Sequence, residues 1–317
     1  MRCSMPCWRR HGHDAMAVMR VATFAANDRM LNAALRTQAR MAQLQMQQAS
    51  GSVATDYGGL GKTARSVLDL EATQKRAAAY AESANQAINR VEVMYATLST
   101  IADLLTDFRG QLTAAMGTDA SGTTTGTLVA AAGVYMQELA ALLNTTFEGR
   151  YLFAGDATGT APVDLTGYTA DAATPSTAYY GGDETVVSVR VSADQSVNYG
   201  VTASNTAFEQ AFRAFGIIAS AAPPDADLIQ QSYEILVGAL DATIAVQSGL
   251  SIDAGTLERA VERHADYDSL LSAAISELKD VDIAAVAVRL ATYETQLQAS
   301  YATLAKLQSL NLVDYLR

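Results

Sequence analysis

Residues 91–112 have the sequence VEVMYATLSTIADLLTDFRGQL. Apolar residues recur in it at heptad spacing in two rows: Val91, Leu98, Leu105 and Leu112, and Met94, Ile101 and Phe108. Two rows with this spacing form one narrow stripe on a helix, which is typical of a coiled-coil seam rather than of the broad apolar face of a globular helix. The stretch therefore predicts a long helix that needs partner helices along its whole length.

The composition also favours long, closely packed helices. Hydrophobic residues make up 50% of the 317 residues, but aromatic residues only 7%. Both cysteines lie within the first seven residues, so we expect no disulfide framework. The net charge of -11 argues against nucleic acid and anionic membrane surfaces as partners. The chain has no run of 18 apolar residues and its N-terminus lacks the apolar core of a cleavable secretory signal, so we expect no membrane insertion.

Prolines divide the chain into helical and non-helical parts. Residues 7–161 and 225–317 contain none, and because proline costs about 3 kcal/mol inside a helix, both stretches permit long helices. Between them, residues 150–153 predict a short strand, and alternating valines over 186–201 predict one or two β-hairpins.

Both ends of the chain predict amphipathic helices. The apolar positions expected to form a self-assembly interface are Leu31, Leu35, Met41 and Leu44 near the N-terminus, and Leu290, Tyr293, Leu297, Tyr301, Leu304, Leu307 and Leu310 near the C-terminus. Such apolar terminal helices need to be covered, either by each other or by neighbouring subunits.

These patterns predict a mainly α fold: an elongated, folded-back coiled-coil rod of long helices, with both chain ends at one end and a small β insert at the other. We expect the two halves of a helical assembly domain over 19–50 and 284–317. A helical rod domain is expected in two parts, over 51–155 and 206–283, with the β-rich insert over 156–205.

Several stretches resemble the bacterial flagellin family, and within it the hook-associated branch at the hook–filament junction. The most specific is LNTTFEGRYLFAG at 143–155, followed by Tyr180-Gly181-Gly182-Asp183. The starting residues 19–23, the polar helix end at 44–52 and the C-terminal stretch 297–316 are also similar to the family. Residues 1–18 have no counterpart in it, so the resemblance implies a leader there that is disordered or precedes the true start. After the first helix this chain has Thr55-Asp56-Tyr57-Gly58 where the family usually has a proline and paired aspartates, which leaves the shape of that loop open.

The resemblance implies a non-enzymatic, structural protein without cofactor or metal, exported to the extracellular flagellum without a cleaved signal peptide. Its implied partners are other copies of itself, the neighbouring hook-junction protein, flagellin and an export chaperone. A filament-forming flagellin is the alternative within the family. An alternative of another class is a surface-exposed glycan-binding protein or adhesin, whose insert would use Tyr168, Tyr179, Tyr180 and Tyr199 as a stacking platform.

Three patterns could carry other chemistry. Residues 58–63 (GGLGKT) look like the end of a P-loop, but Asp56 replaces its first glycine, and a helix-starting turn is the better interpretation. Cys3, Cys7, His11 and His13 are zinc-ligand types without a zinc-site spacing. His264 lies in a predicted seam row, where packing and a hydrogen bond explain it better than catalysis does.

Overall fold

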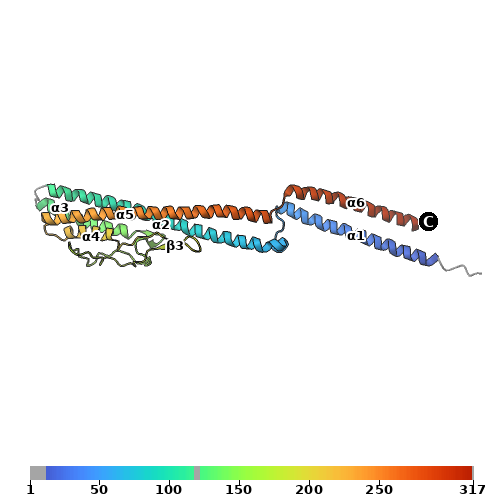
Figure 1. Ribbon diagram of the computed structural model, residues 1–317, viewed down its shortest axis with the longest axis horizontal. Coiled ribbons are helices and arrows are strands. Elements are labelled where there is room, and N and C mark those ends of the chain that lie inside the picture. The colour runs from blue at the N-terminus through green and yellow to red at the C-terminus, as the bar shows by residue number, and fades with distance from the viewer. Residues whose placement is uncertain (1–11, 118–121, 316–317) are drawn as a thin grey trace, which may run out of the picture. The chain divides into compact units, whose positions relative to one another are not determined.

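The structure is a computed structural model that describes the backbone of residues 12–117 and 122–315 and the side chains of residues 25, 27–117 and 125–306. The fold is mainly α, as expected, with two small antiparallel sheets (Figure 1). In chain order the elements are α1 (Gly12–Ser50), the 3-10 helix η1 (Gly58–Thr63), α2 (Ala64–Gly117), α3 (Gly122–Leu143), β1 (Thr146–Phe147), β2 (Arg150–Tyr151), β3 (Ser188–Arg190), β4 (Ser196–Asn198), α4 (Thr206–Ala219), α5 (Ala226–Lys279) and α6 (Ile283–Tyr315).

The chain divides into two compact units. The terminal unit consists of residues 1–71 and 271–317, and the central unit of residues 72–270. The terminal unit therefore extends further along the chain than the expected boundaries at 50 and 284, because it includes the start of α2 and the end of α5.

In the terminal unit, α1 packs along α6 (Figure 1). Helix α1 is followed by Gly51, which has a φ of 69° and donates its backbone N–H to the carbonyl of Gln47. Glycine adopts this conformation without the steric cost that other residues pay. Asp282 then begins α6, because its carboxylate accepts a hydrogen bond from the backbone N–H of Ala285.

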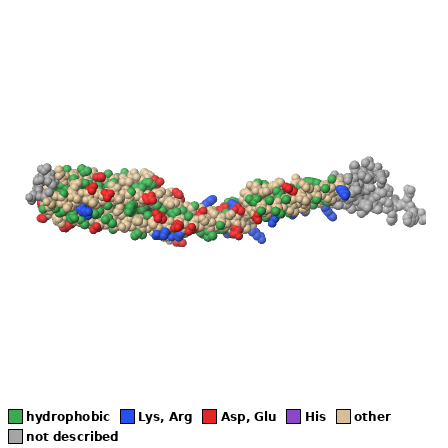
Figure 2. Space-filling model, turned by 90° about the horizontal axis from the view of Figure 1, so that it is seen from above, with side chains coloured by type: hydrophobic (Ala, Val, Ile, Leu, Met, Phe, Trp, Pro, Cys, Tyr) green, Lys and Arg blue, Asp and Glu red, His purple; other side chains and the backbone are tan. Residues whose placement is uncertain are grey.

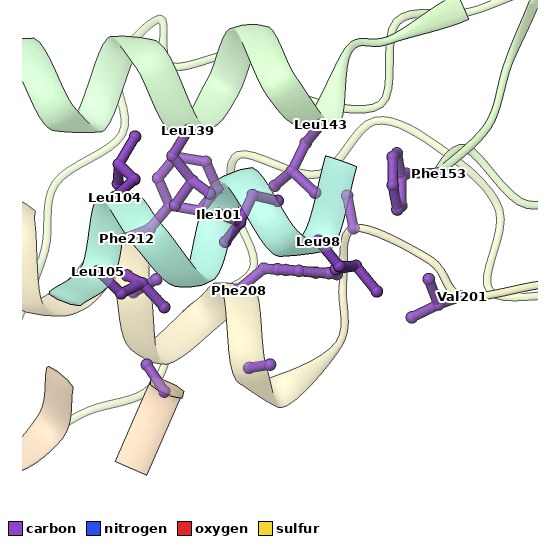
Figure 3. Packing of buried hydrophobic residues seen from close by; sticks show 14 of the residues in the cluster. Leu98, Ile101, Leu104, Leu105, Leu139, Leu143, Phe153, Val201, Phe208 and Phe212 are labelled. Atoms are coloured by element: carbon purple, nitrogen blue, oxygen red, sulfur yellow. The ribbon is translucent and has the colours of Figure 1, made fainter. Parts of the chain in front are cut away.

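The core of the central unit surrounds the heptad stretch of α2. All seven residues predicted for the seam are buried. Phe108 contacts the rings of Tyr135 on α3 and Phe215 on α4, at centroid distances of 5.4 Å and 4.9 Å. Figure 3 shows this arrangement, with Leu98, Ile101 and Leu105 of α2 lying among side chains of α3 and α4. The partner helices of the seam are thus supplied within the same chain.

Two hairpins form the β structure of the central unit. Strands β1 and β2 are joined by Glu148 and Gly149, both with positive φ, the geometry that matches a tight turn to the twist of its strands. Strands β3 and β4 pair Val189 with Val197, so the alternating valines form a single hairpin.

The start of α1 differs from expectation. Residues 12–18 of the expected leader belong to α1, because residues 13–50 contain neither glycine nor proline to break the helix, whereas residues 1–11 lie outside the described structure. Helix α3 begins at Gly122, and the side chain of Thr125 near its start is buried.

Candidate assembly surface

The contact between α1 and α6 is a seam of small and apolar side chains. The buried or half-buried positions include Ala34, Thr37, Met41 and Leu44 on α1, and Val286, Leu290, Tyr293, Leu297, Ser300 and Leu304 on α6. Their alternating spacing of three and four residues keeps each row on one side of its helix. The two terminal helices therefore cover each other along one side only.

A second apolar row on α1 lies outside this seam. Leu31 and Leu35 are 47% and 52% exposed, and Met46 on the same side of the helix is 61% exposed. On α6, Val288 and Tyr301 are 68% and 50% exposed. Figure 2 shows hydrophobic side chains among polar ones on the visible surface of this unit. The helix pair thus leaves large apolar side chains in contact with solvent on both of its members.

The structure therefore separates the residues that were predicted together as one interface. Met41 and Leu44 lie in the seam, as do Leu290, Tyr293, Leu297 and Leu304 of α6, whereas Leu31, Leu35 and Tyr301 face away from it. These positions do not all lie in the seam, because the seam also uses Ala34, Thr37 and Ser300, which hydrophobicity alone does not single out. Leu307 and Leu310 belong to α6, but their side chains lie outside the described part of the structure.

The end of this helix pair is held by a small polar cluster that we call the clasp: Tyr57, Glu71 and Lys279. Glu71 accepts hydrogen bonds from the Tyr57 hydroxyl at 2.6 Å and from Lys279 Nζ at 3.1 Å. These interactions with the Glu71 carboxylate raise the pKa of both Tyr57 and Lys279. Nearby, the backbone N–H groups of Val53 and Val281 bond to the carbonyls of Lys279 and Gly51. The clasp therefore joins the loop after α1 to the start of α2 and the end of α5.

The P-loop-like residues 58–63 form the 3-10 helix η1 within this region. The carboxylate of Asp56 accepts the backbone N–H of Gly59 at 2.8 Å and shapes the turn. The element that precedes the loop is α1, not the buried strand that a P-loop requires. The structure fits the helix-starting turn, and it gives the shape of the loop that the sequence left open.

The two motifs with the strongest family resemblance meet in the central unit. Gly155 has a φ of 66°, and a Cβ atom there would overlap the carbonyl oxygen of Asp183. The backbone N–H of Asp183 in turn bonds to the carbonyl of Ala154 at 2.9 Å. Asn144 fixes the same region: its side-chain amide donates to the carbonyl of Val163 and accepts from its N–H, at 2.9 Å and 3.0 Å. Both motifs thus have a clear role in holding the insert on the helices.

The tyrosines proposed as a sugar-stacking platform do not form one. Tyr179 and Tyr199 are almost fully buried, and the Tyr179 hydroxyl donates to the carbonyl of Ala203. Tyr168 and Tyr179 pack against Phe212, at ring distances of 6.3 Å and 4.3 Å, and burial raises the pKa of Tyr168 to about 12. These rings fill the small core of the insert, which corrects the expectation that they are free to stack on sugar rings.

His264 has the packing role that its heptad position predicts. Its Nε2 lies 2.7 Å from the carbonyl oxygen of Val191, and its ring stacks on Tyr80 of α2 at 5.9 Å. Across the residues with described side chains, no group of three or more histidine, cysteine or acidic residues is placed to hold a metal ion. Cys3, Cys7 and His11, and the side chain of His13, which have no zinc-site spacing, lie outside that part of the chain.

Two helices have windows long and apolar enough to span a membrane, residues 125–143 and a part of α5. Leu139 and Leu143 of α3, and Leu236 and Leu257 of α5, belong to the buried core. Core helices pass the same composition test, so the windows are weak support for a membrane span.

Comparisons with known proteins agree with these features. The family model for the bacterial flagellin N-terminal helical region matches residues 21–158, and the model for the C-terminal helical region matches residues 234–316. No curated protein matches the sequence of this chain.

Three solved structures share the fold. A candidate flagellar hook-associated protein from Vibrio parahaemolyticus is 14% identical, with a TM-score of 0.59 over 71% of this chain and 100% of its own. Flagellar hook-associated protein-3 from Legionella pneumophila is 14% identical, with a TM-score of 0.54 over 66% of this chain and 98% of its own. FlgL from Bacillus cereus is 16% identical, with a TM-score of 0.51 over 63% of this chain and 97% of its own. At these identities the likeness concerns the fold.

Proposed function

Because this chain belongs to the bacterial flagellin family, we propose that it is a structural subunit of the bacterial flagellum, placed at the junction between hook and filament. The family models match its two ends, and α1 and α6 from these ends pair with each other. The proposed role is mechanical and involves no catalysis.

One observation carries this proposal: the terminal helix pair leaves apolar side chains exposed on both helices. Leu31 and Leu35 on α1 and Val288 on α6 lie outside the seam that joins the two helices. Exposed apolar rows of this kind mark protein interfaces. A head-to-tail contact between identical copies buries such rows in a ring or a helical layer. We therefore propose that the terminal helices of neighbouring copies cover them.

The junction role rests on the C-terminal sequence together with the fold. Residues 312–316 (LVDYL) resemble the ending of the junction proteins, whereas flagellins tend to end with a shorter tail. Two of the three solved structures that share this fold are named as hook-associated proteins. A filament-forming flagellin is the second candidate within the family. The two candidates differ in copy number and in location. A junction protein occurs as about one ring per flagellum, whereas a flagellin occurs along the entire filament.

The remaining parts of the proposal concern export and partners. The segment 19–50 would serve as the export address in place of a cleaved signal, with an export chaperone covering the apolar helices before assembly. Terminal helices that order fully only on assembly would keep free subunits from polymerising early. In the extracellular flagellum the partners would be further copies, the hook-junction protein below and flagellin above.

Deletion of the gene followed by electron microscopy tests the junction role. We expect hooks without filaments and unpolymerised flagellin in the medium, restored by the wild-type gene. Normal filaments on the deletion strain would contradict the proposal. Loss of filament subunits without free flagellin in the medium would favour the filament-forming alternative.

A shortened chain tests the part played by α6. Removal of residues 297–317 deletes much of the α6 side of the seam and is expected to give a soluble protein that no longer joins flagella. Incorporation of the shortened chain would show that this part of α6 is not an assembly contact.

A further inference from the structure

A polar cavity of about 420 Å³ lies in the central unit, between α2 and the segment that leads into β3. Gln86 and Arg90 line it from α2, Arg150 and Asp156 line it from the first hairpin and the loop that follows, and Thr185 lines it from the β3 side. A smaller cavity of about 50 Å³ adjoins it, shares both arginines and Asp156, and adds Tyr151 to the lining. Three separate parts of the chain thus bring polar side chains to one space of the size that small ligands occupy.

The two arginines of this cavity differ in their bonding. Arg90 is held in place, because it donates to the Tyr199 hydroxyl at 3.2 Å and lies 3.6 Å from the Glu148 carboxylate. Arg150 makes one hydrogen bond, from Nε to Thr158 at 3.3 Å. No side chain or backbone group within the described structure accepts from its two terminal nitrogens. Arg150 is exposed, so the N–H donors of its planar guanidinium meet solvent and are open to a ligand.

Asp156 supplies acceptors to the same space. Its carboxylate forms no ion pair with Arg90 or Arg150 within the described structure, although all three residues line the cavity. A guanidinium and a carboxylate that face one cavity without pairing leave room for a group that accepts from one and donates to the other.

The charges in and around the cavity limit what this group can be. An anion would be attracted by Arg150 but repelled by Asp156 and by the nearby Glu148. A cation would be repelled by the two arginines. Neighbouring hydroxyl groups on a neutral ring both donate and accept hydrogen bonds, so they match this lining. The half-buried ring of Tyr151 adds an apolar surface beside it. We propose that this cavity binds a neutral sugar residue through Arg150 and Asp156.

Calorimetric titration of the purified full chain tests the proposal, with glucose, galactose, mannose and N-acetylglucosamine as separate probes. We expect at least one of these sugars to bind at millimolar concentrations. Arg150→Ala and Asp156→Asn should each weaken that binding by about tenfold or more, because each removes charge-assisted hydrogen bonds. Arg190→Ala is the matched control, since Arg190 lies in the same insert and bonds to the carbonyl of Ala193 instead. Thermal unfolding of each variant shows whether it is folded.

Three results would overturn the proposal. The first is that none of the four sugars binds at tens of millimolar, and the second is that binding persists unchanged in folded Arg150→Ala and Asp156→Asn. The third is tighter binding of glucuronate than of glucose, which would make the cavity an anion site. If the two variants instead abolish self-association of a chain that binds no sugar, the cavity receives a segment of a second copy. None of these results affects the assembly role of the terminal helices.

Discussion

Lys279 Nζ lies 3.1 Å from Glu71 Oε1, so an ion pair joins the end of α5 to the start of α2 across more than 200 residues of sequence. The other oxygen of the same carboxylate accepts the Tyr57 hydroxyl, and Lys279 lies 5.9 Å from the centre of the Tyr57 ring. One carboxylate thus holds three chain segments of the terminal unit together.

The clasp should make this unit sensitive to alkaline pH. The pKa values of Tyr57 and Lys279 are both raised by Glu71, so each group stabilises the fold while it is protonated. This contribution is complete below the unfolded-state pKa values, about 10 for tyrosine and about 10.4 for lysine, and is lost as pH rises through the folded-state values. Thermal unfolding followed by circular dichroism should therefore show a drop in stability above about pH 10 that is smaller in Tyr57→Phe.

Tyr95→Phe is the matched control for this experiment, because Tyr95 is exposed on α2 outside the clasp. At neutral pH, Glu71→Gln should cost less than about 1 kcal/mol, as expected for a partly exposed ion pair. If Tyr57→Phe and Tyr95→Phe lose stability equally as pH rises, the clasp makes no contribution.

Asn144 should contribute more to stability than an exposed asparagine does. Asn144→Ala removes both hydrogen bonds to the backbone of Val163, a buried residue, and should lower the free energy of unfolding by about 2 kcal/mol. Asn198→Ala on the exposed side of β4 should change it by less than about 0.5 kcal/mol. Urea unfolding of the two variants measures the difference, and equal values would show that the amide pair is not stabilising.

Two glycines with similar backbone conformations should respond differently to substitution. Gly155 and Gly149 have φ values of 66° and 74°, but a Cβ at Gly155 would overlap the backbone of Asp183, whereas a Cβ at Gly149 meets nothing within 4 Å. Gly149→Ala should cost about 1 kcal/mol, the usual penalty for a left-handed residue. Gly155→Ala should cost roughly 3 kcal/mol or more, because the backbone of the insert must also move. Equal losses in urea unfolding would contradict this packing of the two motifs.

The sequence predicts those parts of this fold that show as a regular spacing of large apolar residues along a helix. The rows at 91–112 identify the buried side of α2 because every seam position there is large and apolar. The same reasoning misplaces Leu31 and Leu35 because the part of the α1 seam next to them uses Ala34 and Thr37, which allow close approach of the helices but carry little hydrophobic signal.

Contacts between segments that are far apart in the sequence cannot be predicted from the spacing of apolar residues. Glu71 and Lys279 are ordinary surface residues in the sequence, and only the fold brings them together. From the sequence alone, Tyr168 and Tyr179 could line either a binding surface or a core. In the structure both rings pack against Phe212 of α4, so they belong to a core. The unpaired Arg150 and Asp156 likewise become visible only when α2 and the insert are in place.

The apolar row on α1, which includes Leu31 and Leu35, is covered in our proposal by neighbouring copies of the chain. Leu35→Asp puts a charge into that row without touching the seam. Ala33→Asp puts the same charge on another exposed side of the same helix, two residues away. Since a carboxylate is costly to bury without a partner, only the first change should block a contact between copies.

The most direct measurement is immunogold counting of hook tips in a deletion strain that expresses either variant. We expect labelled hook tips for Ala33→Asp and soluble, unincorporated protein for Leu35→Asp, with both purified variants equally helical. Equal labelling of hook tips by the two variants would contradict it.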